Sequence, residues 1–262
     1  MGTRILRSDL LSLAEVMEIY LDFTRSTLPD ATHRSLAQAE RLLGCFQKAL
    51  GHELPNRLVA IQGLARLLEE GVEDRLEPAD PSLAGRIAEQ AQRADRLVRT
   101  LAEIGRLSGT TAGGPEVSLA DVVREAVGVV GALSAGGPVE YDLQEGMPVV
   151  AVSRRALLEV LVQLLRNAVQ AALPGRPAHV AVGGRRTPAG TEFWVADQGR
   201  GLTPLQGSSL FDPFSRAGSG EGAGLGLFLV RQVVAAWGGT LRVRSEPGQG
   251  TAITVLLPLS KG

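Results

Sequence analysis

The chain has 262 residues, of which 44% are hydrophobic and 21% are charged, and its formal net charge is −1. This length fits one large domain or two modest ones, and the hydrophobic content is ample for a packed core. A net charge near zero argues against a chain that binds nucleic acid broadly, because such binding needs a basic surface.

The cysteine content and the apolar runs bear on the compartment. Cys45 is the only cysteine, and its neighbours Leu42, Leu43 and Phe46 favour a small buried apolar residue over a reactive thiol. No apolar run approaches the roughly 18–20 residues that span a bilayer. The N-terminal stretch contains acidic residues and therefore predicts an amphipathic helix instead of a signal peptide. We expect a cytoplasmic chain without a membrane span.

The N-terminal part, residues 1–30, shows helical spacing of its apolar residues over 8–27. This short helix is either a linker or a packing element for the next helices of the chain. From His33 to Glu70 the apolar residues recur at steps of three and four. That spacing predicts one long amphipathic helix.

A second long helix comes after an acidic turn. Asp80 is the expected N-cap with Pro81 at the first helical position, and the apolar stripe runs on to Leu107. Two such helices form a hairpin that cannot cover both apolar stripes by itself. We therefore expect residues 31–110 to form an α-helical hairpin that pairs with a second copy, as a four-helix bundle in a homodimer.

Residues 108–115, SGTTAGGP, are the expected linker and domain boundary. Beyond them, helices are predicted at 118–133 and 153–173. Strands are predicted at 138–143, 179–184, 191–197, 240–246 and 251–258. For residues 116–262 this pattern predicts an α+β layer, in which helices cover one side of a sheet.

Asp197 ends the predicted strand EFWVAD and is followed by Gly199 and Gly201. A carboxylate at a strand end, beside glycines that let the backbone approach, can accept a hydrogen bond from an exocyclic amine such as adenine N6. Asp-x-Gly is also a common turn sequence, so a surface turn is the alternative.

A glycine-rich loop with Gly222, Gly224 and Gly226 leads into the apolar helix LFLVRQVV. Such a loop presents N–H groups and the positive end of a helix dipole to phosphate oxygens. It is not a P-loop, because no Gly-Lys-Ser/Thr follows, and no strand leads directly into it as in a dinucleotide-binding motif. A plain helix start is the alternative to a phosphate site.

Asn167 lies inside a predicted helix that is otherwise lined by leucines. Asparagine is a poor residue for a helix interior, so its carboxamide is expected to bond something. Two partners are open, a Mg²⁺ ion with its water shell or a group within the fold.

In order and spacing, these pieces resemble the N, G1, F and G2 boxes of the ATP-binding (Bergerat) fold of histidine kinases, type II topoisomerases, heat-shock chaperones and mismatch-repair ATPases. Gly248-Gln249-Gly250-Thr251 resembles the final glycine box, and the resemblance covers roughly residues 116–259. It implies that Asn167 binds Mg²⁺ and that Asp197 holds adenine. Further nucleotide contacts are implied for Gly199, Gly201, Phe214, Arg216, Gly222, Gly224, Gly226, Leu227 and Thr251.

Two positions qualify this resemblance. Arg216 follows the F-box sequence FDPF, where a lid cation would face the γ-phosphate, although a solvated loop arginine is the alternative. Gln163 stands one turn before Asn167, where members that hydrolyse ATP with water usually have glutamate as the base. Glutamine cannot take a proton near neutral pH. A phosphate acceptor elsewhere is therefore implied.

His52 lies mid-way along the first long helix, in GHELPNRL. At ~100° per residue it is about 200° from Leu50, opposite the apolar seam, so it should project into solvent. Asn56 lies one turn away on nearly the same face, and Glu53 is adjacent. Neutral imidazole is a competent nucleophile, and a neighbouring carboxylate can hold the tautomer. An exposed histidine with ordinary neighbours is the alternative.

The stretch resembles the H box of histidine kinases, His-Glu-x-x-Asn/Thr. This implies that His52 is the phosphoacceptor, Glu53 the general base and Asn56 the residue that positions water for dephosphorylating a partner. The family usually has proline five residues after the histidine, whereas here Pro55 is three after it and Arg57 takes the customary place. Pro55 is still expected to loosen the helix near His52 by removing an N–H bond.

Together the resemblances imply a sensor histidine kinase core that uses ATP and Mg²⁺, autophosphorylates on His52 and passes phosphate to an aspartate of a response-regulator receiver domain. His33 and His179 have no comparable surroundings. Two rivals remain, a degenerate kinase that acts as a nucleotide-binding dimeric scaffold and an ATP-driven conformational machine like the chaperones. Gln163 opposes the second.

Overall fold

The computed structural model describes residues 32–69, 82–107, 115–133, 138–215 and 224–259. The helix predicted at 8–27, the acidic turn and nearly all of the predicted linker lie outside these ranges. The chain separates into two compact units, Met1–Val98 and Arg99–Gly262. The predicted domain limits, 31–110 and 116–262, stay a prediction.

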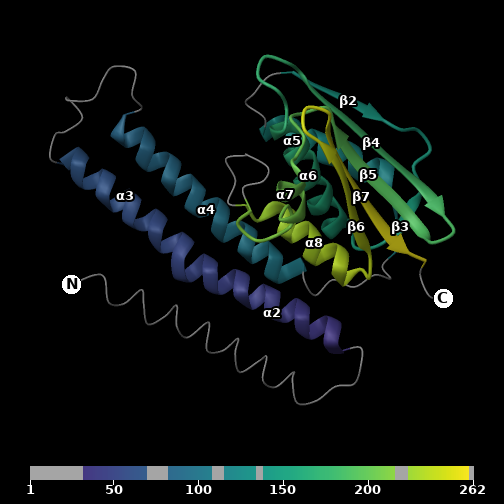
Figure 1. Ribbon diagram of the computed structural model, residues 1–262, viewed down its shortest axis with the longest axis horizontal. Helices are drawn as coiled ribbons and strands as arrows, with labels where there is room; N and C mark the ends of the chain where they lie inside the picture. Colours follow the sequence, from purple (N-terminus) through teal and green to yellow (C-terminus); the bar gives the residue numbers. More distant parts are fainter. Residues whose placement is uncertain (1–31, 70–81, 108–114, 134–137, 216–223, 260–262) are drawn as a thin grey trace. The chain divides into compact units, whose positions relative to one another are not determined.

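The first unit contains a continuous helical run made of α2 (Thr32–Lys48), a π-helical turn η1 (Ala49–Glu53) and α3 (Leu54–Glu69) (Figure 1). In η1 the Leu54 N–H donates to the carbonyl of Ala49, five residues earlier. In a regular α-helix, the ring of Pro55 would collide with a carbonyl of the preceding turn. The predicted loosening near His52 is confirmed, and it takes the form of a π turn.

Helix α4 (Leu83–Leu107) begins two residues later than the sequence predicts. The Ser82 hydroxyl accepts a hydrogen bond from the Gly85 N–H at 3.0 Å, so Ser82 is the N-cap. The predicted N-cap Asp80 and the predicted first helical residue Pro81 both lie outside the described residues. The last turns of α4 belong to the second unit, where Glu103 pairs with Arg155 at 3.3 Å.

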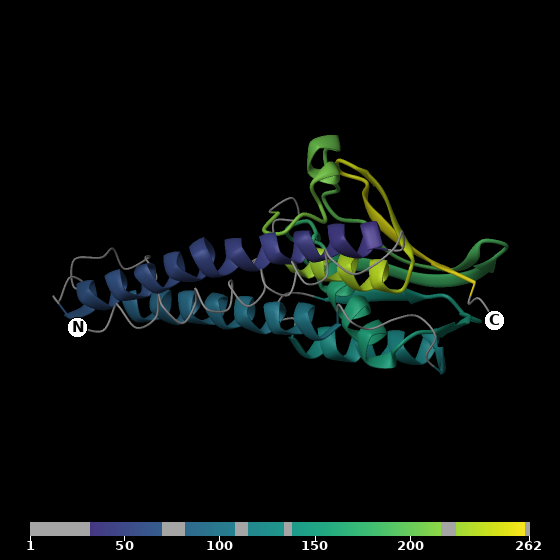
Figure 2. The same cartoon turned by 90° about the horizontal axis from the view of Figure 1, so that it is seen from below.

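The second unit is a mixed five-stranded sheet in the order β2-β4-β5-β7-β6, in which only β2 and β4 run parallel. Its strands are β2 (Val139–Leu143), β4 (Ala178–Thr187), β5 (Gly190–Asp197), β6 (Thr240–Glu246) and β7 (Gly250–Pro258). Helices α5 (Leu119–Leu133), α6 (Arg154–Gln170) and α8 (Gly226–Ala236) lie on one face (Figure 2). The predicted α+β layer is confirmed.

The core of this unit lies between the sheet and the helices. Phe193 and Val195 of β5 and Val255 of β7 are at most 3% exposed, and they alternate with more exposed residues. Each such side chain contributes roughly 1.5–3 kcal/mol on burial. Helix α6 is central, since it contacts α5, α8, β4 and β5. Side chains on the last turn of α6 are therefore held on a well-packed helix.

Three short elements were not predicted. Strands β1 (Glu116–Ser118) and β3 (Val149–Ala151) form a separate antiparallel pair. Helix α7 (Pro204–Ser208) begins with a capping box, in which the Thr203 hydroxyl accepts from the Gln206 N–H and the Gln206 side chain accepts from the Thr203 N–H. In the chain, β1 comes after the predicted linker, β3 precedes α6, and α7 comes shortly after β5.

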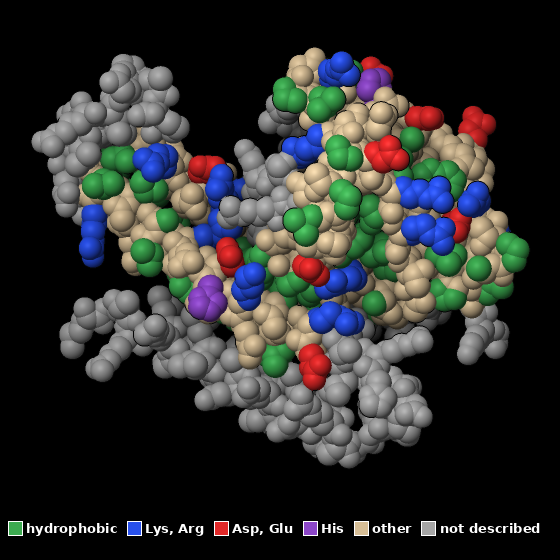
Figure 3. Space-filling model, in the orientation of Figure 1, with side chains coloured by type: hydrophobic (Ala, Val, Ile, Leu, Met, Phe, Trp, Pro, Cys, Tyr) green, Lys and Arg blue, Asp and Glu red, His purple; other side chains and the backbone are tan. Residues whose placement is uncertain are grey.

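The distribution of surface charges and the burial of Cys45 agree with the predictions from the sequence. Basic and acidic side chains alternate over the visible face of the α/β unit, as a net charge of −1 suggests (Figure 3). Cys45 is 1% exposed, and burial raises the pKa of its thiol to about 12, which confirms a buried apolar role. Within the described ranges, no helix combines the length and apolarity that crossing a bilayer requires.

Candidate functional site

Asp197 is the last residue of β5, and its side chain is only 9% exposed. Its Oδ1 accepts hydrogen bonds from the Gly199 N–H at 2.8 Å and the Thr251 N–H at 3.2 Å. Burial raises the pKa of this carboxyl, while these two bonds and the charge of Arg200 lower it. Among the described residues both bonds end on Oδ1, so Oδ2 can accept a hydrogen bond from an exocyclic amine.

The loop after Asp197 is docked on the end of α6. A Cβ on Gly199 would lie 2.2 Å from the Ala171 carbonyl oxygen, a distance that only glycine permits. Next to it, the Arg200 N–H donates to the same oxygen at 2.9 Å and the Arg200 guanidinium donates to the Gln170 carbonyl at 2.9 Å. Asp197 thus makes the turn bond that is typical of Asp-x-Gly, but it does so as a buried residue and not at the surface.

Gly201 and the start of β7 close the other side of this loop. Gly201 has φ 63°, and a Cβ there would lie 1.9 Å from the Glu246 carbonyl oxygen. Gly250 has φ 96°, and its Cβ would lie 1.9 Å from the Asp197 carbonyl oxygen. The Gly248 N–H donates to the Arg200 carbonyl at 2.7 Å. Three segments that are distant in sequence thus meet near Asp197 and Thr251, namely the end of α6, the loop after β5 and the start of β7.

Asn167 lies in the last turn of α6, and not in the middle of a helix running to residue 173 as predicted. It is half-buried, and one turn earlier Gln163 donates from Nε2 to the Glu159 carboxylate at 2.6 Å. The Gln163 Oε1 then faces Gly226, where an added Cβ would lie 2.5 Å from this oxygen. The amide oxygen of Gln163 is therefore directed toward the start of α8.

Gly224 and Phe214 hold the entry to α8 through their backbones. The Phe214 N–H donates to the Gly224 carbonyl at 2.9 Å, and Phe214 has φ 63°, a rare value for a residue with a side chain. Gly224 has φ 71°. Gly226 is the first residue of α8, followed by the half-buried Leu227. The predicted contacts Arg216 and Gly222 lie outside the described residues.

The described residues of the predicted nucleotide set fall into two groups. Asp197, Gly199, Gly201 and Thr251 meet at the end of β5. Asn167 lies one turn after Gln163 on α6, and the amide oxygen of Gln163 faces Gly226 at the start of α8. An N–H-lined helix start and a buried acceptor on one layer can hold a phosphate chain and a purine.

His52 lies in the π turn and is exposed, as predicted, and Asn56 is exposed as well. Glu53 Oε2 lies 3.8 Å from the Arg57 Nη2, and their side chains are 30% and 14% exposed. This pair was missed, although a four-residue spacing of opposite charges on a helix is a signal for it. Glu53 thus has a cationic neighbour on the same helix as the predicted phosphoacceptor.

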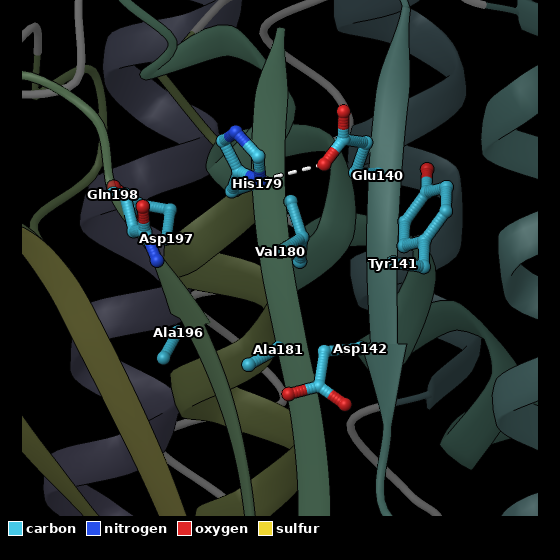
Figure 4. A pocket seen from close by; sticks show the side chains of 9 residues that line it. All are labelled: Glu140, Tyr141, Asp142, His179, Val180, Ala181, Ala196, Asp197 and Gln198. Carbon is cyan, nitrogen blue, oxygen red and sulfur yellow. Dashed lines mark ion pairs between the residues drawn. The ribbon is translucent and has the colours of Figure 1, made fainter.

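A hollow of about 360 Å³ lies on strands β2, β4 and β5, and Asp197 and Gln198 at the end of β5 are among the residues that line it. His179 Nδ1 lies 3.0 Å from Glu140 Oε2, and Figure 4 shows these side chains directed toward each other across β4 and β2. With Asp142 also in its lining, the hollow carries carboxylates and no glycine-rich loop. His179 therefore does have a carboxylate neighbour, which was not predicted from the sequence.

Residues 152–261 match the family described as histidine kinase-, DNA gyrase B-, and HSP90-like ATPase. The methanogenesis regulatory histidine kinase FilI of Methanothrix harundinacea is 30% identical, over 81% of this chain and 24% of its own length. The sensor histidine kinase ZraS of Escherichia coli strain K12 is 30% identical, over 83% of this chain and 46% of its own length. The chain thus spans less than half the length of these relatives.

A solved structure shows the same fold. The histidine kinase AdeS of Acinetobacter baumannii matches with a TM-score of 0.60 at 20% identity, over 80% of this chain and 98% of that chain. The Bergerat-type sheet with helices on one face, the glycine-built pocket around Asp197 and the family match agree with one another. Residues 152–261 therefore form an ATP-binding domain of the GHKL type, and over most of its length the chain is similar to sensor histidine kinases.

Proposed function

We propose that the chain transfers the γ-phosphoryl group of ATP to His52 and then to an aspartate of a response-regulator receiver domain. The observation that supports this proposal most is the buried acceptor Asp197, held by two backbone N–H groups, together with glutamine instead of a base at position 163 of α6. A pocket that binds ATP without activating water needs another acceptor. The exposed His52 supplies a nucleophile of the right chemistry.

In the pocket, Asp197 Oδ2 accepts the adenine amine, and the backbone N–H groups at the start of α8 face the phosphates. The N-terminus of this helix carries a partial positive charge, which stabilises phosphate oxygens. The glycine at 226 leaves room for this approach because, among the described residues, only the end of Gln163 lies near its missing Cβ.

The amide oxygens of Asn167 and Gln163 fit a magnesium ion, which prefers hard oxygen ligands and keeps several waters. Gln163 is suited to this because its NH₂ group is bonded to Glu159, which leaves its oxygen toward α8. When bound, Mg²⁺ supplies charge neutralisation for the β- and γ-phosphates. Asn167 would be the residue that holds it.

At the acceptor, the unprotonated imidazole nitrogen of His52 forms the P–N bond while the bond between the γ-phosphorus and the bridging oxygen breaks and ADP leaves. The proton on the other imidazole nitrogen passes to Glu53. Asn56, exposed one turn away, is the residue proposed to position water for dephosphorylating the regulator. Transfer of this kind depends mainly on positioning and charge neutralisation.

The helices of the first unit expose apolar side chains that support a homodimer. Leu58, Val59, Leu67 and Leu68 of α3 and Val98 of α4 are between 38% and 65% exposed. Large exposed apolar groups gathered on two helices mark an interaction surface. We propose that a second copy covers them as a four-helix bundle. The cytoplasmic location remains a prediction.

The scaffold alternative is not favoured, because the named relatives are histidine kinases and Asp197 is a buried acceptor held by backbone N–H groups. The test is incorporation of label from γ-labelled ATP with Mg²⁺, followed by acid and base treatment of the product. We expect label that is lost in acid, survives base and does not form in the presence of a chelator. ATP binding without label would favour the scaffold, and steady hydrolysis without label would favour a conformational machine.

A further inference from the structure

Ser245, near the end of β6, belongs to none of the sequence motifs, yet its hydroxyl joins three segments around Asp197. It accepts a hydrogen bond from the Leu202 N–H at 2.9 Å, donates to the Gly250 carbonyl at 2.9 Å and lies 2.9 Å from the Thr251 hydroxyl. Leu202 follows the loop after Asp197, and Gly250 and Thr251 begin β7. One side chain therefore connects the loop and the strand that form the pocket.

Counting protons fixes the direction of these bonds. A serine hydroxyl has one proton and two lone pairs, and a carbonyl oxygen can only accept. The Ser245 proton is directed to the Gly250 carbonyl, and one lone pair receives the Leu202 N–H. The Thr251 hydroxyl must then donate its proton to the second lone pair of Ser245. Ser245 is fully satisfied in this arrangement.

This direction determines what Thr251 offers a ligand. Thr251 is 6% exposed and pairs with Asp197 across β7 and β5, where its N–H donates to Asp197 Oδ1. With its hydroxyl proton given to Ser245, Thr251 Oγ1 presents only lone pairs. The ionised carboxylate of Asp197 also only accepts. The side-chain oxygens of Asp197 and Thr251 are therefore acceptors alone.

We propose that Ser245 is a specificity-determining residue, which takes the Thr251 proton and so makes the pocket select a 6-amino purine over a 6-oxo purine. The amine of adenine donates to such a site, whereas the carbonyl of a 6-oxo purine places an acceptor against acceptors. A buried polar group without a partner is costly, and this cost gives the discrimination. The inference rests on the proposed binding of ATP at Asp197.

The test is the ratio of dissociation constants of inosine triphosphate and ATP, measured by calorimetry on the whole chain. Inosine triphosphate differs from ATP only at the 6-position and the adjoining N1 proton. In Ser245→Ala the Thr251 hydroxyl is released to rotate and donate to the 6-oxo group. We expect the ratio to fall about five- to tenfold, the worth of one hydrogen bond. Because both constants come from one variant, a loss of folded protein does not change their ratio.

Four further variants separate an effect on hydroxyl orientation from an effect on stability. Ser245→Thr keeps the hydroxyl and should restore the wild-type ratio. Ser208→Ala removes an exposed hydroxyl that, among the described residues, bonds to Leu205 in its own helix α7, and it should leave the ratio unchanged. In a Thr251→Val background, Ser245→Ala should no longer alter the ratio, since the hydroxyl to be oriented is gone. If Ser245→Ala does not fold, Ser245→Cys, a much weaker acceptor, should still lower the ratio.

An unchanged ratio in Ser245→Ala or Ser245→Cys, with ATP still bound, would overturn the role of Ser245 and leave the proposed kinase function intact. An equal change in the Thr251→Val background would also overturn it, because the effect would not pass through Thr251. Failure of the wild-type chain to bind either nucleotide would instead overturn the proposed ATP site, and this inference with it.

Discussion

The nucleotide pocket and the phosphoacceptor helix are built in opposite ways. Around Asp197 the structure depends on backbone, because Gly199, Gly201 and Gly250 leave no space for a Cβ and backbone N–H groups hold the carboxylate. Around His52 the chemistry depends on side chains, and both His52 and Asn56 are exposed on one helix. One site is assembled from distant segments, and the other from consecutive turns.

This difference predicts how each site responds to substitution. A side chain added at one of the pocket's glycines disturbs packing and binding together, since the same close backbone approach serves both. A change at an exposed helix position leaves folding nearly intact and alters only the chemistry. Substitutions in both sites therefore test whether the pocket depends on backbone packing and the acceptor helix on exposed side chains.

The largest effect is expected for Gly201→Ala. Its Cβ would lie 1.9 Å from the Glu246 carbonyl oxygen at φ 63°, so both steric overlap and backbone strain oppose folding. We expect the free energy of unfolding, measured in denaturant, to fall by at least about 2 kcal/mol. Gly207→Ala is the control, because nothing lies within 4 Å of its Cβ. Equal stability of both variants would show that the loop is not held as described.

Asp197→Asn should weaken ATP binding by at least about tenfold, because an amide replaces a charged acceptor that is held by two N–H groups. Calorimetric titration of the whole chain measures this. The fold should persist, since the side chain keeps its size. Unaltered affinity would mean that adenine is bound elsewhere.

The raised pKa of Asp197 predicts how nucleotide affinity and folding stability change with pH. Burial raises the pKa of Asp197, and the bonds to Gly199 and Thr251 only partly oppose this. Nucleotide affinity should therefore decline as the pH falls through this raised pKa, at a higher pH than an ordinary aspartate would give. The contribution of Asp197 to folding stability has the opposite sign, being present at low pH and lost as the pH rises through the same pKa. Asp197→Asn should abolish this component of both profiles.

Pro55→Ala tests the π turn and should have a moderate effect. Without the proline, the segment can adopt a regular α-helix. The turn then holds one residue fewer than the π turn does, so the two flanking helical segments rotate relative to each other by ~100°. We expect stability to rise by about 1 kcal/mol and phosphorylation of His52 to fall several-fold. Pro204→Ala, at the first position of α7, is the control. Normal phosphorylation in Pro55→Ala would separate the π turn from function.

The smallest effect is expected for Arg57→Gln, which removes the 3.8 Å contact with Glu53. A pair of this length is worth little, so its coupling energy, measured in a double-mutant cycle with Glu53→Gln, should be less than about 1 kcal/mol. Arg185→Gln, which breaks an exposed pair with Glu192 at 2.8 Å, is the comparison. A loss several times larger would show that the acceptor helix is as tightly built as the pocket.

Long periodic segments could be predicted from the sequence, whereas short ones could not. The pattern over 153–173 is strong enough to place α6, although it overran the end at Gln170 by three residues. Strands β1 and β3 have three residues each, too few for any periodicity. The proline at 55 predicts a disturbed helix, but the choice of a π turn depends on how the carbonyls nearby are rebonded.

Most of the pocket could be predicted because glycine spacing and a strand-end aspartate are local signals. The contribution of Ser245 was missed, although Leu241 and Val243 precede it on the same face of β6 and a polar residue at an inward position is a signal. Its partners on the loop and β7 depend on tertiary contacts, which the sequence does not show.

Phosphorylation of His52 is tested most directly by comparing His52→Gln with His179→Gln under γ-labelled ATP and Mg²⁺. His179 is a control of the same residue type, since it is also exposed and has a carboxylate neighbour, and ATP binding is measured in each variant because His179 lines the same hollow as Asp197. We expect acid-labile label in the wild-type chain and in His179→Gln, and none in His52→Gln, while all three bind ATP equally. Label that persists in His52→Gln, or disappears in His179→Gln, would contradict the assignment of His52 as the phosphoacceptor.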